Sequence, residues 1–259
     1  MVTTNIEKAR TYHRAVSSHD VGTVHGMIRE DYIQHNPRVP TGRAAFVSLL
    51  PQLQKHDTRI ENIRIFQDGS HVIMHHLWKN AAPFGADQKV AFHIIRFDQD
   101  GLIAEHWSVM TDLTPPNASG RTLIDGPRDV GPATAATEGN KRKVRELFQS
   151  IIETKPRGLQ TTYSKFFHKD LLQHHPELAD GIPSFSGAIE NGTFTYHRQH
   201  KVFGSGDFVL SISEGARANL PFAFYDLFRL EDGLIAEHWN VSQEIPSEGL
   251  ANENTMFNF

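Results

Sequence analysis

The sequence predicts two consecutive domains of the α+β class, each made of helices followed by an antiparallel sheet. Three observations support this prediction. The segment GLIAEHW occurs twice, at residues 101–107 and 233–239. In each half, a helical pattern of apolar residues precedes short runs that are rich in β-forming residues. At 259 residues, the chain is long enough for two domains of ordinary size, each with its own core.

The repeat extends well beyond GLIAEHW, which indicates a tandem duplication. We align AFHIIRFDQDGLIAEHWSV at residues 91–109 with AFYDLFRLEDGLIAEHWNV at residues 223–241 without a gap. Upstream, DYIQHNPRVPTGRAAF at residues 31–46 aligns with DLLQHHPELADGIPSF at residues 170–185. Both blocks occur in the same order in the two halves, so we infer that a whole domain was duplicated.

The first half is predicted to begin with three helices. Thr4 and Glu7 have the spacing of a capping box, and an apolar stripe follows on one helical face. Further helices are predicted over residues 21–29 and 43–54. A similar stripe begins the second half. The stripes consist of Ile6, Ala9, His13 and Val16 in the first half, and of Val144, Leu147, Phe148, Ile151 and Ile152 in the second.

Strands are predicted after Thr58, where the pattern changes to the short runs RIENIRIF, HVIMHHLW, KVAFHIIRF and LIAEHWSVM. DQDG and LEDG separate the last two runs of the two copies and predict hairpin turns. Helices followed by hairpin-linked strands give an α+β layout, with the helices packed on one sheet.

The domain boundaries follow from composition. We predict a first domain over residues 1–113, a linker over 114–137 and a second domain over 138–259 that includes the C-terminal tail. The linker is rich in Pro, Gly, Ala and Thr. The tail is expected to be irregular and to pack through Phe257 and Phe259.

Composition also excludes several functions. A net charge of −4 gives no reason to expect nucleic-acid binding. The chain has no cysteine, which excludes disulfides, thiolate nucleophiles and cysteine metal sites. Its start has no apolar core of a signal peptide, and no run approaches the roughly 20 apolar residues of a membrane span. We therefore expect a cytoplasmic protein that does not bind membranes.

The predicted layout, the ending FRLEDGLIAEHWNVSQEIP and the block around residues 34–37 and Gly42 resemble the SnoaL-like, polyketide-cyclase-like branch of the NTF2-like superfamily. The resemblance implies a cone-shaped fold in which helices close over a curved sheet and leave a deep pocket. It also implies cofactor-free acid–base chemistry on a small organic molecule. Because such domains commonly pair through their sheet faces, it implies an internal pseudo-dimer and leaves homo-oligomerisation open.

The last predicted strand of each half carries several candidate residues. Strand alternation places His106 and Ser108 on the face opposite to Trp107. In cyclases that the chain resembles, an acid–base carboxylate commonly follows directly after EHW, at the position of Ser108. A serine does not exchange protons near neutral pH, and neither does the asparagine of the second copy. The corresponding residues of the second half are His238, Asn240 and Trp239.

Asp226 is the carboxylate that we expect to take over this role. It lies in the apolar run FYDLFRL, where a charge costs several kcal/mol unless it is paired or protonated. His238 on the adjacent strand is a candidate partner, and Asn240 a candidate donor to a developing oxyanion. The ungapped alignment makes Ile94 the first-half equivalent of Asp226. The alternative is a structural role, in which Asp226 bonds a loop or bridges the domains.

The first half offers imidazoles in place of carboxylates. Histidine is a natural general base near neutral pH, and His35, His93 and His106 are the candidates for a first pocket. Converging imidazoles also bind Zn²⁺. Because no spacing such as HExxH supports a metal, we expect neither metal nor cofactor. The histidines of the helix-to-sheet region are His35, His71, His75, His76, His93 and His106.

Two features that recur in both copies have structural alternatives. The Gln-His pair ending in His35 or His174 is either a clamp on backbone carbonyls or a part of the pocket rim. Trp107 and Trp239, each preceded by Glu-His, are expected to pack in the core or to form a domain-pairing surface. The glutamates would then form ion pairs with arginines across that surface. The candidate substrate-binding residues are Asn240, Ser108, His174, Trp107 and Trp239.

These features predict a lyase, isomerase or cyclase that transfers protons at an activated carbon of a small, partly apolar molecule. Asp226 and His238 would act in the second pocket. A non-catalytic ligand-binding or scaffold protein is the main alternative, favoured by Ser108, Asn240 and Ile94. An epoxide or lactone hydrolase is a further alternative.

Overall fold

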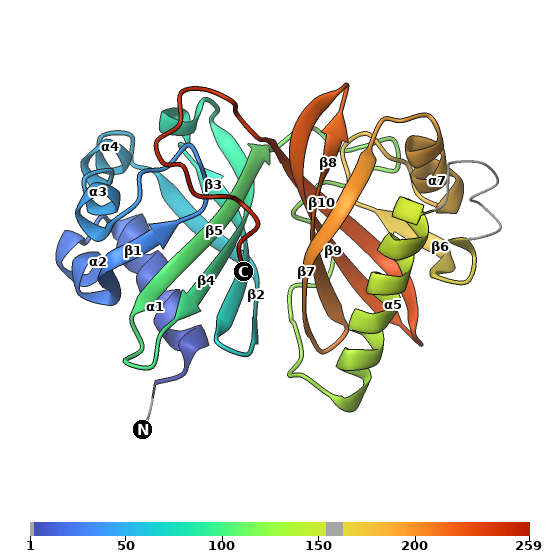
Figure 1. Ribbon diagram of the computed structural model, residues 1–259, viewed down its shortest axis with the longest axis horizontal. Helices are drawn as coiled ribbons and strands as arrows, with labels where there is room; N and C mark the ends of the chain where they lie inside the picture. Colours follow the sequence, from blue (N-terminus) through green and yellow to red (C-terminus); the bar gives the residue numbers. More distant parts are fainter. Residues whose placement is uncertain (1–2, 154–162) are drawn as a thin grey trace. The chain divides into compact units, whose positions relative to one another are not determined.

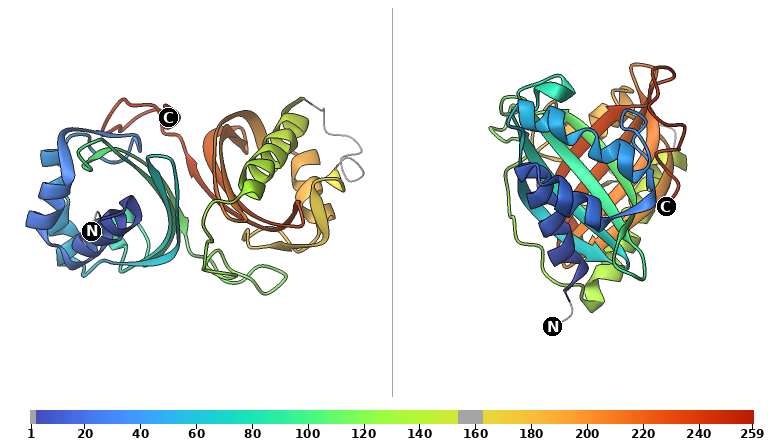
Figure 2. Two further views of the ribbon diagram at one scale, coloured as in Figure 1. Left: turned by 90° about the horizontal axis from the view of Figure 1, so that it is seen from below. Right: turned by 90° about the vertical axis from the view of Figure 1, so that its left-hand side faces the viewer.

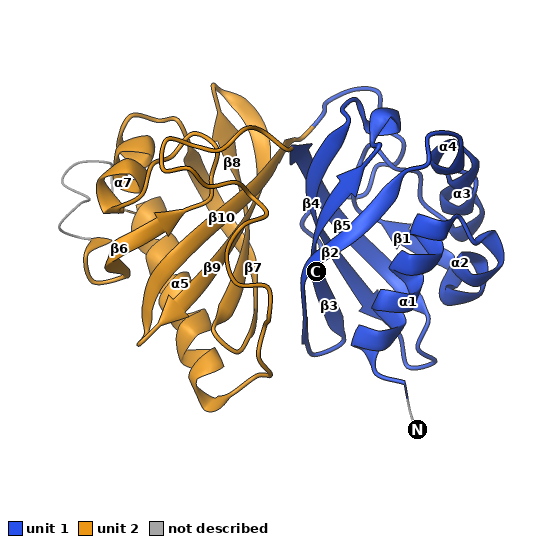
Figure 3. Ribbon diagram, turned by 180° about the vertical axis from the view of Figure 1, so that it is seen from behind, with its two compact units in different colours: residues 1–112, 246–258 blue, residues 113–245, 259 orange. Residues whose placement is uncertain are grey.

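The computed structural model describes residues 3–153 and 163–259. The chain divides into two compact units, shown in two colours in Figure 3. Unit 1 comprises Met1–Asp112 and Pro246–Asn258, and unit 2 comprises Leu113–Ile245 and Phe259. Among the described helices, none is long and apolar enough to cross a membrane.

Unit 1 contains a five-stranded sheet with the strand order β1-β5-β4-β3-β2. Its hairpin-linked strands are antiparallel, whereas β1 pairs parallel with β5. The curved sheet is packed with helices, and α1 lies on its concave side (Figures 1 and 2). The elements are α1 (Asn5–Ser18), α2 (Val21–Met27), β1 (Ile28–Gln34), α3 (Arg43–Val47), α4 (Leu50–Lys55), β2 (Arg59–Asp68), β3 (His71–Lys79), the 3-10 helix η1 (Ala82–Phe84), β4 (Gln88–Phe97) and β5 (Ile103–Asp112).

Unit 2 repeats this arrangement, with the strand order β6-β10-β9-β8-β7 and β6 parallel to β10. The predicted α+β class and the two tandem domains, each with helices packed on its sheet, are confirmed. The elements are α5 (Ala135–Glu153), β6 (Phe167–Gln173), α7 (Ile182–Glu190), β7 (Thr195–Ser205), β8 (Phe208–Arg217), β9 (Leu220–Glu231) and β10 (Leu234–Glu244).

The helices follow the predicted pattern with two differences. The capping box is confirmed, because Thr4 Oγ1 accepts from the Glu7 amide and the Glu7 carboxylate accepts from the Thr4 amide. The single helix predicted over residues 43–54 is two helices, because Pro51 in the first turn of α4 cannot continue a helix from α3. The strand β1 was not predicted, since Arg29, Glu30 and Asp31 interrupt its apolar pattern.

The hairpins that carry GLIAEHW differ by one residue. In unit 1 residues 98–102 connect the paired residues Phe97 and Ile103, whereas in unit 2 residues 231–234 connect Leu230 and Ile235. The ungapped alignment of the preceding strands is therefore wrong by one position. Since side chains alternate along a strand, this shift changes which residues face the helices.

The segments that follow β5 and β10 are exchanged between the units. Residues 113–134, here the first arm, belong to unit 2, and residues 246–258, here the second arm, belong to unit 1. The predicted boundaries differ from this division, since they place the C-terminal tail in the second domain. The reason lies in side-chain hydrogen bonds: Asn252 Nδ2 donates to the carbonyls of Asn36 (2.8 Å) and Val39 (2.7 Å) in unit 1.

Two glycine substitutions test the packing of unit 2 with opposite expected signs. A Cβ at Gly215 in β8 would overlap the Thr195 carbonyl oxygen of β7, so Gly215→Ala should lower the free energy of unfolding by about 1–3 kcal/mol. A Cβ at Gly187 inside α7 meets no atom within 4 Å, so Gly187→Ala should raise it by about 0.5–1 kcal/mol. Urea unfolding measures both; destabilisation of equal size in the two variants would contradict the packing described.

Candidate active site

Asp226 occupies the centre of β9 and is completely buried. It pairs with Asn240 of β10 on one side and with Ser211 of β8 on the other. A carboxylate in such a position must find donors, because an unpaired buried charge costs several kcal/mol. The residues around it supply them.

Three side chains contact the same carboxylate oxygen. Tyr196 Oη donates to Asp226 Oδ1 at 3.1 Å, and Asn240 Nδ2 donates to it at 2.7 Å. His238 Nε2 lies 2.9 Å from this oxygen. Burial and the neighbouring Asp226 raise the pKa of Tyr196 well above its ordinary value, so its hydroxyl remains a donor. The predicted group of Asp226, His238 and Asn240 thus lies together.

Asp226 and His238 are joined by a short contact between Oδ1 and Nε2. His238 Nδ1 donates to Gln173 Oε1 at 2.9 Å, which assigns one ring proton to Nδ1. The contact between Nε2 and Oδ1 then needs a second proton, carried either by the imidazolium or by a carboxylic acid. The contact joins a nitrogen and an oxygen that both belong to buried side chains.

The second carboxylate oxygen of Asp226 does not share these partners. Asp226 Oδ2 is buried and has no hydrogen-bond partner among the described residues. The ring of His238 stacks on Phe228 with the centroids 4.8 Å apart and meets the edge of Phe185. This apolar surrounding strengthens the electrostatic interactions of the pair.

The counterpart of Asp226 in unit 1 is His93. Asn240 pairs with Asp226, and Ser108 at the same place in β5 pairs with His93. The predicted equivalent, Ile94, is corrected by this register, which follows from the one-residue difference in the hairpins. An imidazole therefore stands where the second copy has a carboxylate.

His93 and His106 form a buried chain in unit 1. His106 Nε2 lies 3.0 Å from His93 Nδ1, and His106 Nδ1 lies 2.9 Å from Tyr32 Oη. Gln34 Nε2 donates to the same Tyr32 oxygen at 2.9 Å. Ser108 lies beside this chain and accepts from Asn36 Nδ2 through its hydroxyl oxygen at 3.2 Å.

Two further histidines extend the chain towards α1. His76 of β3 lies beside His93, and His13 of α1 lies beside His76. Burial lowers the pKa of His13 to about 3, an effect to which the charge of His106 adds. Burial likewise lowers the pKa values of His76, His93 and His106 well below the ordinary value. These imidazoles are neutral at physiological pH.

His35 does not join this group. Its ring stacks on Trp107 at a centroid distance of 4.4 Å and an angle of 4°, on the opposite face of the sheet from His106. His35 Nδ1 donates to the Thr255 carbonyl of the second arm (2.8 Å), and Nε2 meets Glu105 Oε2 (3.0 Å). Both ring nitrogens therefore face acceptors, one in the second arm and one in β5.

Unit 2 contains the same arrangement of a histidine stacked on a tryptophan and bonded to a glutamate and an arm carbonyl, here called the clamp. His174 stacks on Trp239 at 4.3 Å and 12°, with Nε2 2.9 Å from Glu237 Oε2. His174 Nδ1 donates to the Thr122 carbonyl of the first arm at 3.1 Å. His174, Trp107 and Trp239 thus hold the arms and are kept away from the Asp226 and His93 groups.

Each glutamate of a clamp also pairs with an arginine of the neighbouring strand. Arg96 Nε donates to Glu105 and Arg229 Nε to Glu237, at 2.8 and 2.7 Å. Each tryptophan Nε1 donates to an arm carbonyl, Trp107 to Asn258 at 3.1 Å and Trp239 to Asp125 at 3.0 Å. The repeated Glu-His-Trp therefore secures the exchanged arms on one face and supplies an inward histidine on the other.

Several residues of these groups were not predicted, among them Tyr32 and Gln34. Gln173 belongs to the recurring Gln-His pair, so its presence in both copies was an available signal. Tyr196 and His13 had no such signal, because they reach the groups from β7 and α1 across the domain.

Comparison with known proteins finds a family that is similar to the first unit. Residues 9–106 match the family model of the SnoaL-like domain. The match spans most of unit 1 from α1 into β5, and unit 2 repeats the strand order of unit 1. No curated protein matches the chain.

Solved structures resemble one half of the chain at low identity. An NTF2-like protein of unknown function from Cytophaga hutchinsonii has 11% identity and a TM-score of 0.36, over 43% of this chain and 93% of its own. An LEH-like epoxide hydrolase of M. tuberculosis has 18% identity and a TM-score of 0.35, over 41% and 82%. IdmH of Streptomyces antibioticus, a proposed polyketide cyclase, has 19% identity and a TM-score of 0.36, over 41% and 91%.

Glu237→Gln tests the clamp of unit 2 and its pH dependence. Burial raises the pKa of Glu237, but the bonds from His174 and Arg229 outweigh this and hold it below its ordinary 4.5. A lowered folded-state pKa gives stability that is complete above the unfolded value and is lost as the pH falls through the folded value. The variant should cost about 1–3 kcal/mol near neutral pH. This difference from wild type should shrink below about pH 4.5.

Urea unfolding followed by tryptophan fluorescence over a pH series measures this difference. Glu231→Gln is the matched control, because Glu231 pairs with the same Arg229 at 3.5 Å but its side chain is 60% exposed. Its effect should be small at every pH. A Glu237→Gln difference that stays constant from neutral to acid pH would contradict the assigned bonds.

Proposed function

We propose that unit 2 catalyses cofactor-free proton transfer at an activated carbon of a small organic molecule, as a lyase, isomerase or cyclase. One observation carries this proposal: a buried carboxylate holds three donors on Oδ1, while Oδ2 is left without a protein partner among the described residues. A purely structural aspartate would be expected to use both oxygens.

Asp226 Oδ2 would act as the general base. The contacts of Tyr196, His238 and Asn240 fix the carboxylate plane, so that Oδ2 faces the substrate in one orientation. In isomerisation, the proton taken from carbon returns to another carbon. In ring closure, the carbanion forms a C–C bond to a carbonyl carbon and the proton goes to the resulting alkoxide; cleavage of an aldol adduct is the reverse, starting with removal of the hydroxyl proton. Asn240, expected to donate to an oxyanion, instead supports the base through its donation to Asp226.

His238 would balance the charge of the base. With its second proton on Nε2, the imidazolium neutralises the carboxylate while Gln173 fixes the ring through Nδ1. The aromatic neighbours Phe185 and Phe228 keep water from the ring and suit a partly apolar substrate. These features support carbonyl compounds with an acidic C–H, such as β-diketones, β-keto esters and aldol adducts.

Asp226→Asn tests the proposal directly. The variant keeps the shape of the side chain but removes the base, so the catalysed rate should fall by about 100-fold or more. The measurement is solvent-deuterium incorporation into a panel of these carbon acids. Asp232→Asn is the matched control, because it removes a carboxylate from the exposed turn of the same β9–β10 hairpin and should keep the wild-type rate.

Three outcomes separate the alternatives. Exchange that is lost in Asp226→Asn and kept in Asp232→Asn supports the proposal. Exchange that persists in Asp226→Asn overturns Asp226 as the base and directs attention to the histidines of unit 1. Binding of the compounds without exchange or turnover would favour a non-catalytic ligand-binding protein, and ring opening of epoxides or lactones would favour a hydrolase.

A further inference from the structure

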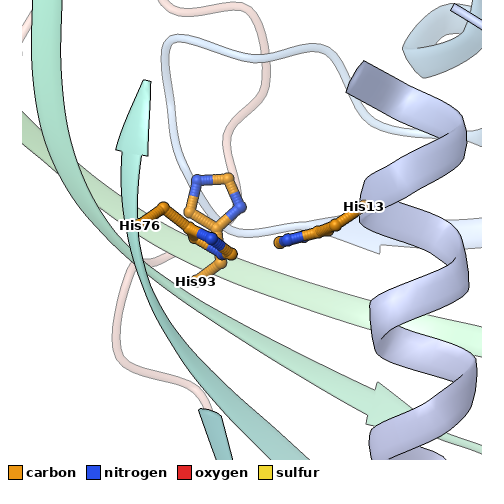
Figure 4. A group of neighbouring side chains, drawn as sticks. All are labelled: His13, His76 and His93. Atoms are coloured by element: carbon orange, nitrogen blue, oxygen red, sulfur yellow. The ribbon is translucent and has the colours of Figure 1, made fainter. Parts of the chain in front are cut away.

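Three histidines from distant parts of the chain converge inside unit 1. His13 comes from α1, His76 from β3 and His93 from β4, and their exposed fractions are 2%, 0% and 7%. Figure 4 shows the ring of His13 projecting from its helix towards the rings of His76 and His93 on the strands. None of the three lies in a short sequence motif, so only the fold brings them together.

Their spacing suits a common ligand. One ring nitrogen from each histidine lies within 4.8 Å of the other two. Three imidazoles bound to one Zn²⁺ at about 2.0–2.1 Å would have their nitrogens about 3.3–3.5 Å apart in a tetrahedral site. The three nitrogens must therefore move closer together by at most about 1.5 Å to bind one ion.

The hydrogen bonding of the rings leaves nitrogens available. Both nitrogens of His76 are buried without a hydrogen-bond partner in the described parts of the chain, and the side chain of Asn62 lies beside His13. A buried polar atom that nothing binds destabilises the fold, so the nitrogens of His76 favour a ligand between the rings.

His93 is held in a way that suits a ligand. Its Nδ1 faces His106 Nε2 at 3.0 Å, and His106 is held in turn by Tyr32. In the tautomer in which His93 Nδ1 donates to His106, the lone pair of Nε2 is free. Metal-binding histidines are commonly oriented by such a bond at their second nitrogen.

The second copy shows that the fold does not require histidine at these positions. Through the strand register, His93 corresponds to Asp226 and His76 to Ser213. The buried stripes of α1 and α5 align His13 with Phe148. The same fold is thus built with an aromatic residue, a hydroxyl and a carboxylate, and the three imidazoles are particular to unit 1.

We propose that His13, His76 and His93 bind a divalent transition metal ion, with Zn²⁺ the best fit. Imidazole ligands favour Zn²⁺, Cu²⁺ or Ni²⁺ over Mg²⁺ and Ca²⁺, which prefer oxygen. Three ligands leave a fourth position of the tetrahedron for water. Asn62, which pairs with His76 in the sheet and interacts with His13, is the polar side chain beside these ligands.

The experiment measures metal binding to the full chain with Zn²⁺ and Co²⁺ as probes. Metal content of the purified protein and calorimetric titration give the stoichiometry, and the visible spectrum of the Co²⁺ form reports tetrahedral coordination. We expect one equivalent per chain, tetrahedral Co²⁺ bands that Zn²⁺ displaces, and a higher unfolding temperature with metal.

The variants use residues that the second copy already accommodates. His13→Phe and His76→Ser should each weaken binding by about 100-fold or more, and the double variant should show no tetrahedral Co²⁺ spectrum. His56→Gln is the control for surface histidines, since His56 is exposed, and it should keep the wild-type affinity.

Two results would overturn the proposal. Wild-type protein that binds less than one equivalent of Zn²⁺ and Co²⁺, both as purified and after titration, has no such site. Binding that persists in a folded His13→Phe, His76→Ser double variant, or that is lost in His56→Gln, belongs to other histidines. Circular dichroism establishes folding for each variant, and the single variants serve if the double variant is unfolded.

Discussion

The alternation of histidine and tryptophan along the last strand of each unit is the constraint on which both faces of the sheet depend. His106 and His238 point towards the helices and contact the groups around His93 and Asp226. Trp107 and Trp239 point the other way and hold the arms. Because adjacent residues of a strand cannot face the same side, the repeated segment serves both faces in both copies. This explains why it is retained where the neighbouring chemistry differs.

The same scaffold position carries different chemistry in the two units. At the centre of the sheet, unit 2 places a carboxylate in contact with His238, whereas unit 1 places a neutral imidazole beside His106. Around the carboxylate the second copy supplies donors, Tyr196 and Asn240. Around the imidazole the first copy supplies further imidazoles. The same fold thus surrounds the carboxylate of Asp226 and the imidazole of His93 with different side chains.

Sequence patterns predicted what is local or adjacent in the sheet. The Thr4–Glu7 cap, the hairpins and the group of Asp226, His238 and Asn240 follow from spacing and strand pairing. The alignment of Ile94 with Asp226 was wrong because the hairpin of unit 1 has one extra residue, which shifts the register of β4. The identity of the two GLIAEHW segments hides this difference. His13 and the arms could not be predicted, since their contacts join segments far apart in the chain and no short motif records them.

The exchange of the arms makes the two halves inseparable by a single cut. A fragment that ends at Asp112 would keep the first clamp but lose the segment that Trp107 and His35 bind, because that segment is encoded at the far end of the chain. The remaining fragment, residues 113–259, would contain residues 246–258 without the part of unit 1 that they contact. Expression of unit 1 alone therefore requires a rearranged gene, in which residues 246–258 are joined to the first half by a new linker, whereas residues 113–245 of unit 2 are continuous in the chain.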